Sequence, residues 1–118
     1  MLSPLRHQLH AMAARPDAAG AMVMSDEGLV IDAVLPGGIE AEAVAALAAT
    51  ALRTLAGLGE ALRTGQPRQL VFDAPHGVAV LERFGSGTTI LVLAAEHGDV
   101  GQLLHDLRLQ GPAIAELV

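Results

Sequence analysis

The 118-residue sequence predicts an α/β (α+β) fold in which helices cover both faces of a five-stranded, mostly antiparallel sheet. Three observations predict it. Apolar residues recur at helical spacing near both ends and in a long central segment; five short runs are rich in Val, Leu and Met; and turns containing Gly, Pro or Ser separate these runs. The expected order is α-β-β-α-β-β-β-α, within a single domain over residues 1–118.

Three helices are expected. The first covers residues 3–14, and the second covers residues 40–64, a stretch without Pro that a Gly-Gln-Pro turn ends. Asp99 is expected to cap the third helix, with Gln102 at the matching capping-box position. Gly111-Pro112 is expected to end or kink that helix.

Five strands are expected between and after these helices. The first hairpin turns at Ser25-Asp26-Glu27-Gly28, and the turns Ala74-Pro75-His76-Gly77 and Gly85-Ser86-Gly87 link the last three strands. Such short links join antiparallel neighbours. The predicted strands are residues 21–24, 29–34, 69–73, 78–83 and 88–94.

The composition argues against several partners. The net charge is −6, the seven cationic side chains are scattered Arg residues, and there are two Phe and no Trp or Tyr, so nucleic acid is not expected as a partner. The longest apolar stretch, Ala43 to Leu52, is about half the ~20 residues that a membrane crossing needs. Membrane insertion is not expected, and the chain opens without a signal-peptide pattern, so a cytoplasmic location is expected.

The sequence lacks most of the residue types and spacings that catalysis or metal binding requires. The chain has no Cys and no Lys, which excludes a cysteine nucleophile, a thiolate zinc site and a P-loop. His7 and His10 lie three residues apart but lack a third ligand, and His105 and Asp106 point to different helix faces. No catalytic residue, metal site or cofactor is therefore predicted.

The central helix has too few polar residues for a monomer's surface. Between Ala43 and Gly59 its only charged residue is Arg53. Two apolar stripes are expected, of which one packs on the sheet and the other contacts a partner. The stripes are Ala48, Leu52, Leu55, Gly59 and Leu62, and Val44, Leu47, Ala51 and Leu58. The alternative is that Ala is simply a good helix former that tolerates water.

A polar edge accompanies these stripes on the same helix. It consists of Thr50, Arg53, Thr54 and Thr64. A self-complementary helix patch is a natural route to a two-fold dimer, in which small residues such as Ala51 and Gly59 would let two helices approach closely. Internal packing against the sheet is the alternative for those two positions.

Four segments together resemble the Roadblock (dynein light-chain) superfamily, and its bacterial gliding-regulator-like branch in particular. They are the hairpin strand 21–30, with its Ser-Asp-Glu-Gly-Leu turn, the Ala/Leu-rich helix 42–63, the strand entry 67–72 and the helix start 99–104. The turn and the helix are common features, so their joint order carries the resemblance. Many relatives have Asp where this chain has Glu40, a poorer N-cap, so Gly38 is expected as a possible cap instead.

The resemblance implies a non-catalytic homodimer that binds a Ras-like small GTPase. It places the central helix on one sheet face and the two terminal helices on the other, and it joins two copies through strand 69–73 and antiparallel central helices. The predicted dimer contacts are Val44, Leu47, Ala48, Ala51, Leu55, Leu58, Leu70 and Phe72, and the predicted partner-facing residues are Thr50, Arg53 and Thr54. The alternatives are a small-ligand sensor or assembly subunit on the same scaffold, and a cryptic hydrolase.

Overall fold

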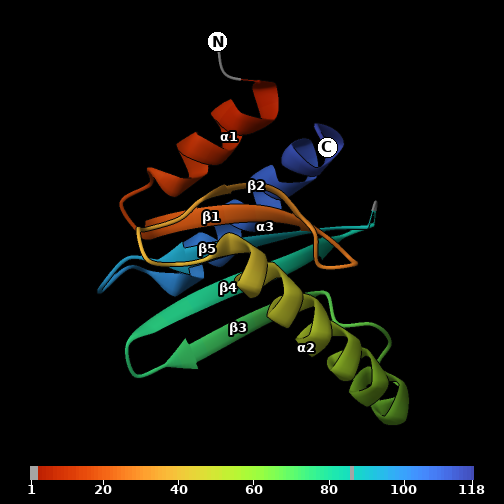
Figure 1. The fold of residues 1–118 in the computed structure, drawn as a ribbon. Helices are drawn as coiled ribbons and strands as arrows, with labels where there is room; N and C mark the ends of the chain where they lie inside the picture. The colour runs from red at the N-terminus through yellow and green to blue at the C-terminus, as the bar shows by residue number, and fades with distance from the viewer. Residues whose placement is uncertain (1–2, 86) are drawn as a thin grey trace.

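The computed structural model describes residues 3–85 and 87–118. Its elements follow the predicted order, and the five strands form one antiparallel sheet in the order β2-β1-β5-β4-β3 (Figure 1). The predicted fold class is therefore confirmed. The elements are α1 (Pro4–Ala13), β1 (Ala18–Ser25), β2 (Val30–Val34), α2 (Ala41–Leu62), β3 (Gln69–Ala74), β4 (Gly77–Phe84), β5 (Thr88–Ala94) and α3 (Val100–Glu116).

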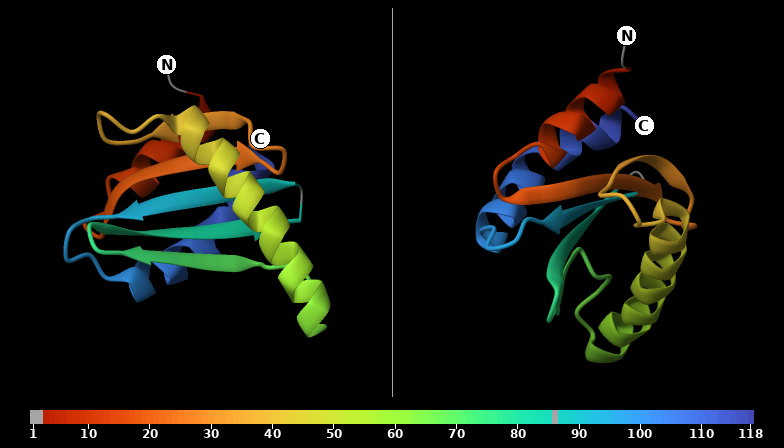
Figure 2. Two further views of the ribbon diagram at one scale, coloured as in Figure 1. Left: turned by 60° about the horizontal axis from the view of Figure 1, so that its bottom comes forward. Right: turned by 60° about the vertical axis from the view of Figure 1, so that its left-hand side comes forward.

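The sheet is covered on both faces. Helices α1 and α3 lie on one face, and α2 crosses the other face obliquely, with its C-terminal end extending beyond β3 (Figure 2). Strand β1 shows why its apolar run is continuous: Ala21 and Val23 point to the α1/α3 side, whereas Met22 and Met24 point to the α2 side. A strand buried on both faces needs apolar residues at every position.

The turn between β1 and β2 is built by the residues of the Ser-Asp-Glu-Gly segment. The Ser25 hydroxyl accepts a hydrogen bond from the Leu29 amide at 3.2 Å, and Gly28 adopts a φ of 89°. A Cβ at Gly28 would lie 3.0 Å from the Cβ of Ala49 on α2, so the turn packs directly under that helix. Asp26 pairs with Arg83 of β4 at 3.2 Å. The segment is thus a structural element of the fold.

Helix α2 begins at a weak cap. Glu40 is its N-cap, and the Glu40 side chain makes no capping hydrogen bond; the Glu40 carbonyl accepts from the Val44 amide at 3.1 Å. The expectation that Gly38 caps this helix is wrong. Gly38 has a φ of 88° and lies in the preceding turn, where its lack of a side chain permits the left-handed conformation.

Helix α3 does not end at Gly111-Pro112, so of the two expected outcomes, an end or a kink, the end is wrong. The helix continues to Glu116, because Ile114 beyond the proline is buried in the core against the sheet. Gly111 serves close packing here: a Cβ at this position would lie 2.0 Å from Cζ of Phe84. Tertiary burial therefore compensates for the backbone hydrogen bond that Pro112 cannot donate. The Asp99 cap is confirmed, since its carboxylate accepts from the Gln102 amide at 3.0 Å.

Candidate protein-interaction site

The two sides of α2 differ sharply in exposure. Its inward side buries Ala45, Ala49, Leu52 and Gly59, and the two alanines belong to the core between α2 and the sheet. Its outward side leaves large apolar side chains in solvent: Leu47 is 71% exposed, Leu58 52% and Leu62 63%. A surface helix of a monomer normally carries polar residues there. The outward side of α2 is therefore an apolar surface without a partner inside its own fold.

The predicted division of α2 into two stripes is correct in principle but rotated in detail. Leu62 is exposed although Leu52 and Gly59 of the same predicted stripe are buried, and the most buried positions of the helix are Ala45 and Ala49. Gly59 does not serve a contact between two helices, because a Cβ there would lie 2.1 Å from the carbonyl oxygen of Gly65. Gly59 lets the loop after α2 fold back on the helix, where its carbonyl accepts from the Thr64 amide at 2.9 Å.

Strand β3 adds a second exposed feature beside α2. It pairs with β4 on one side only and so leaves one strand edge open. Leu70 lies opposite Leu81 and faces α2, and Phe72, two residues on, faces the same way with 62% of its surface exposed. Val71 on the other face is 49% exposed and was missed by the sequence analysis. An open edge with exposed apolar side chains is a template for pairing with another strand.

A groove connects the C-terminal half of α2 to β3. It has a volume of about 280 Å³. Leu55, Leu58 and Leu62 of α2 line one side, and Pro67 and Leu70 line the other. Helix α2 and the open edge of β3 lie on the same side of the molecule (Figure 2), and residues of both line the groove. We refer to these three features together as the α2/β3 face.

The eight predicted interface residues lie on α2 and β3 with different degrees of exposure. Leu47, Ala51, Leu58 and Phe72 are exposed. Val44, Ala48, Leu55 and Leu70 are half-buried, and three of these, Val44, Ala48 and Leu70, also pack against the core beneath α2. The first group is available in full to a partner. The second group supports the helix and the strand from within.

The predicted polar edge of α2 is exposed and internally hydrogen-bonded. The Thr50 hydroxyl donates to the Ala46 carbonyl at 3.1 Å, and the Thr54 hydroxyl donates to the Thr50 carbonyl at 3.1 Å. Arg53 donates from Nη2 to the Thr50 hydroxyl at 3.2 Å. Arg53 also lines a cavity of about 100 Å³ beneath α2, together with Asp26 and Arg83. Such bonds between neighbours on a helix are weak, so the guanidinium group is free to contact a partner.

The residues considered for catalysis or metal binding are placed apart. Among residues 3–85 and 87–118 no group of three or more His, Asp or Glu side chains is arranged to hold a metal ion. Asp106 is not paired with His105, because its carboxylate contacts Arg15 at 3.1 Å and Gln102 at 2.9 Å. The Ser3 and Ser25 hydroxyls accept hydrogen bonds from backbone amides. Ser86, in the third predicted turn, lies outside the described residues.

A polar groove of about 740 Å³ lies at the start of β3, between the loop after α2 and helix α3. Arg68, Glu82 and Arg108 line it. Glu82 is 5% exposed, and its Oε1 lies 3.7 Å from Nε of Arg108, while Oε2 has no hydrogen-bond partner among the described residues. The sequence gives no sign of this groove, because its charged residues come from segments that lie far apart in the chain: the loop before β3, strand β4 and helix α3.

The length and composition of α2 would suffice to cross a membrane, with a mean hydropathy of 1.3 over the best window. Ala45 and Ala49 of this helix are nevertheless part of the core beneath it, and the helix also carries three exposed charged residues, Glu42, Arg53 and Glu60. Burial of one side against the sheet and charged residues at exposed positions fit a helix that covers the sheet. The apolar residues of α2 that do not pack on the sheet are exposed on the α2/β3 face.

The fold and the exposed face together define a class: a small sheet-and-helix domain with an open strand edge beside a helix that exposes apolar side chains. Residues 6–94 match the family model of the Roadblock/LC7 domain, and the chain belongs to that family. The protein MJ0310 of Methanocaldococcus jannaschii is 30% identical over 77 residues, which are 65% of this chain and 68% of that protein.

Solved structures of Roadblock/LC7 proteins share the fold over nearly the whole chain. A Roadblock/LC7 domain from Streptomyces avermitilis is 24% identical, with a TM-score of 0.83 over 98% of this chain and 95% of that one. MglB of Myxococcus xanthus is 13% identical, with a TM-score of 0.82 over 98% and 92%. The MglB of Thermus thermophilus, named a gliding protein, has the same fold at 13% identity, with a TM-score of 0.74 over 96% and 84%. The resemblance to this superfamily is confirmed, and gliding proteins are among its structural neighbours.

Proposed function

We propose that the chain is a non-catalytic regulator or scaffold that forms a homodimer and binds a Ras-like small GTPase in the cytoplasm. The observation that carries the proposal is the α2/β3 face, where an open strand edge and a long apolar helix side lie together without a partner. Membership of the Roadblock/LC7 family supports it, because the resemblance implies this mode of association.

In the proposed dimer, two β3 strands pair antiparallel about a two-fold axis. The pairing joins the two sheets and brings the two α2 helices beside each other, so that Leu47, Leu58 and Phe72 leave water. A two-fold contact uses the same patch on both copies, which fits a face that is apolar throughout. Exposed leucine and phenylalanine side chains each contribute roughly 1.5–3 kcal/mol when fully buried.

The GTPase would bind to the polar edges of the two α2 helices. Thr50, Arg53 and Thr54 lie on the solvent side of α2 and stay accessible when the apolar side is covered. Arg53 supplies hydrogen-bond donors and one positive charge per copy, and the threonine hydroxyl oxygens supply acceptors, which suits the polar surface of a GTPase. We propose Arg53 as a binding contact in this complex, through which the dimer modulates GTP hydrolysis.

The dimer is tested by replacing Leu47 with glutamate. Leu47→Glu places a charge in the proposed contact, and we expect the molar mass from light scattering to fall from twice 12.1 kDa to the monomer value. The matched control is Leu109→Glu on α3, where the leucine is 66% exposed but lies away from the α2/β3 face. An unchanged mass for folded Leu47→Glu would remove Leu47 from the interface.

The partner is tested by affinity capture. The purified protein serves as bait for a native lysate, with a GTP analogue in one arm and GDP in the other, and Arg53→Ala serves as a second bait. We expect a Ras-like GTPase to be retained, with a preference for one nucleotide and weaker retention by Arg53→Ala. Retention of no GTPase in either arm by a folded, dimeric bait would contradict the regulator proposal.

The polar groove favours one alternative, a sensor of a small anionic ligand. Arg68 and Arg108 supply donors and positive charge, and Glu82 supplies a buried acceptor beside them. Ligand sites are concave and carry a few convergent polar groups. Calorimetric titration with inorganic phosphate tests this alternative, and binding that Arg108→Ala abolishes would favour the sensor.

A further inference from the structure

The sheet has two edge strands, and they differ in how their outer backbone groups are treated. Strand β3 forms one edge and β2 the other. Within residues 3–85 and 87–118, no recorded side-chain hydrogen bond reaches the backbone of β3. The middle of β2, by contrast, carries two such bonds at a single residue, Ala33.

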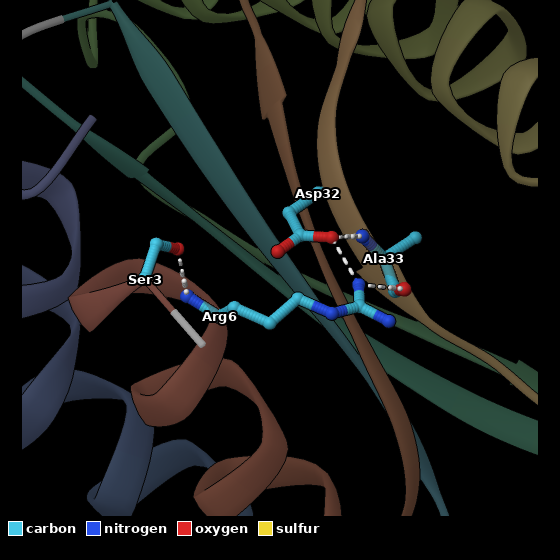
Figure 3. Close-up of polar contacts among 4 residues, drawn as sticks. All are labelled: Ser3, Arg6, Asp32 and Ala33. Atoms are coloured by element: carbon cyan, nitrogen blue, oxygen red, sulfur yellow. Dashed lines mark hydrogen bonds and ion pairs between the residues drawn. The ribbon is translucent and has the colours of Figure 1, made fainter. Parts of the chain in front are cut away.

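Arg6 and Asp32 together occupy the N–H and C=O of Ala33 (Figure 3). The Ala33 amide donates to Oδ1 of Asp32 at 2.8 Å, and its carbonyl accepts from Nη1 of Arg6 at 3.0 Å. The same Nη1 also donates to Oδ1 of Asp32, which closes a ring of three interactions. Alternate residues of an edge strand direct both backbone groups outward, and these side chains satisfy that pair at Ala33.

The arrangement is held in place by α1. Ser3 caps the first turn of α1 by accepting from the Arg6 amide at 3.1 Å, and Leu9 and Met12 anchor the helix in the core. Arg6 therefore reaches β2 from a fixed position, with its side chain 37% exposed and that of Asp32 19% exposed. Charge-assisted hydrogen bonds at partly buried sites are stronger than those at fully exposed ones.

We propose that the Arg6–Asp32 pair is an edge cap that closes β2 to strand pairing and so limits association to the β3 edge. The surface it closes is otherwise suited to pairing with a further copy of this chain. Ile31 in β2 is exposed, and so are Leu29 and Ile39 on either side of the strand, with Leu29 at 67%. Natural sheets block such edges with charged side chains.

The consequence concerns the form of the assembly. A copy with one open edge makes a closed two-fold dimer, whereas a copy with two open edges continues to pair without closure. Loss of the cap converts each dimer into a unit with two free β2 edges. This inference rests on the proposed β3 dimer only for the molar mass expected of the wild-type protein. The cap itself acts on β2 whether the protein is a monomer or a dimer.

The test removes the cap and measures molar mass by light scattering over a range of protein concentrations. Arg6→Ala combined with Asp32→Ala is expected to raise the mass at least twofold above wild type, increasing with concentration. Arg15→Ala is the matched control, because it breaks an ion pair of similar burial, Arg15 to Asp106 at 3.1 Å, that touches no strand edge. Its mass is expected to equal that of wild type.

A second background separates this inference from the proposed dimer. Phe72→Asp blocks the β3 edge and is expected to give a monomer, and removal of the cap in that background is expected to give a dimer through β2. If Phe72→Asp leaves the mass unchanged, the β3 dimer is wrong while the cap is still tested. If the uncapped protein keeps the mass of its parent in both backgrounds, the cap proposal is overturned.

Folding of the variants is checked by circular dichroism. Should the double variant unfold, Arg6→Gln alone carries the same test. Glutamine keeps part of the side chain but loses the guanidinium group, which contacts both Asp32 and the Ala33 carbonyl. Hydrogen exchange gives an independent measurement. The Ala33 amide is expected to exchange faster in folded Asp32→Ala than in wild type, and an equal rate would show that Asp32 does not cap it.

Discussion

Gly111 lies at a position where the structure leaves no room for a side chain. It lies inside α3, where glycine is an unfavourable residue, yet the ring of Phe84 occupies the volume that a side chain would need. The glycine therefore allows α3 to approach the sheet. The same residue type at Gly57 in α2 has no heavy atom near the position of a Cβ and serves no such contact.

These two glycines give opposite predictions for the same substitution. Gly111→Ala is expected to lower the free energy of unfolding by roughly 1–3 kcal/mol, because the methyl group would overlap Phe84. Gly57→Ala is expected to raise it by about 0.5–1 kcal/mol through the greater helix preference of alanine. Urea denaturation followed by circular dichroism measures both. Equal effects of the two substitutions would contradict the packing of Gly111 on Phe84.

Helix α3 shows at the scale of an element how packing overrides a local signal. Gly111-Pro112 is a strong stop pattern, yet the helix continues because Ile114 reaches the core and is 1% exposed. Helix stability in proteins comes mainly from tertiary packing of one face. The last turn of α3 is therefore part of the core rather than a tail.

The position of Ile114 yields a second prediction. Ile114→Ala is expected to cost roughly 2–5 kcal/mol in the free energy of unfolding, the range for large-to-small substitutions in a core. Leu109→Ala on the exposed side of α3 is the control, with an expected change within about 0.5 kcal/mol. If Ile114→Ala proves as mild as Leu109→Ala in urea denaturation, the helix does not continue past Pro112 in solution.

Helix α2 shows the converse at the same scale, a helix whose burial within its own fold is incomplete. Its inward side is lined mainly by small residues such as Ala45 and Ala49, while Leu47, Leu58 and Leu62 face solvent. Three of its five leucines are thus exposed in the monomer. This distribution is the physical basis for the proposed dimer.

For the whole molecule, the proposed dimer predicts a coupling between concentration and stability. Association that covers the α2/β3 face stabilises the folded state by mass action, so the Tm of wild type is expected to rise with protein concentration. The Tm of Leu47→Glu is expected not to depend on concentration, because the variant is monomeric. Scanning calorimetry over a hundredfold concentration range measures the difference. A concentration-independent Tm for wild type would contradict the dimer.

The sequence by itself determined the order and type of the elements. The turn at Ser25–Gly28, the Pro-free central helix and the Asp99 cap are local signals, and local signals depend on neighbouring residues alone. The excess of apolar residues on the central helix is likewise visible in the sequence, because the number of charges in a helix does not depend on the fold. Leu47 could therefore be predicted as an apolar residue without a place in the core, whereas Phe72 was expected at a contact only from the family resemblance, and both are exposed in the structure.

Only the tertiary structure decided which contacts each residue makes. The assignment of Gly59 to its own loop, the continuation of α3 past Pro112 and the polar groove around Glu82 all depend on segments that lie far apart in the sequence or on close approach of the backbone. The difference between the two sheet edges also belongs here. Strand order places β2 and β3 at the edges, and the position of α1 brings Arg6 to Ala33, because such contacts form only when the chain is folded.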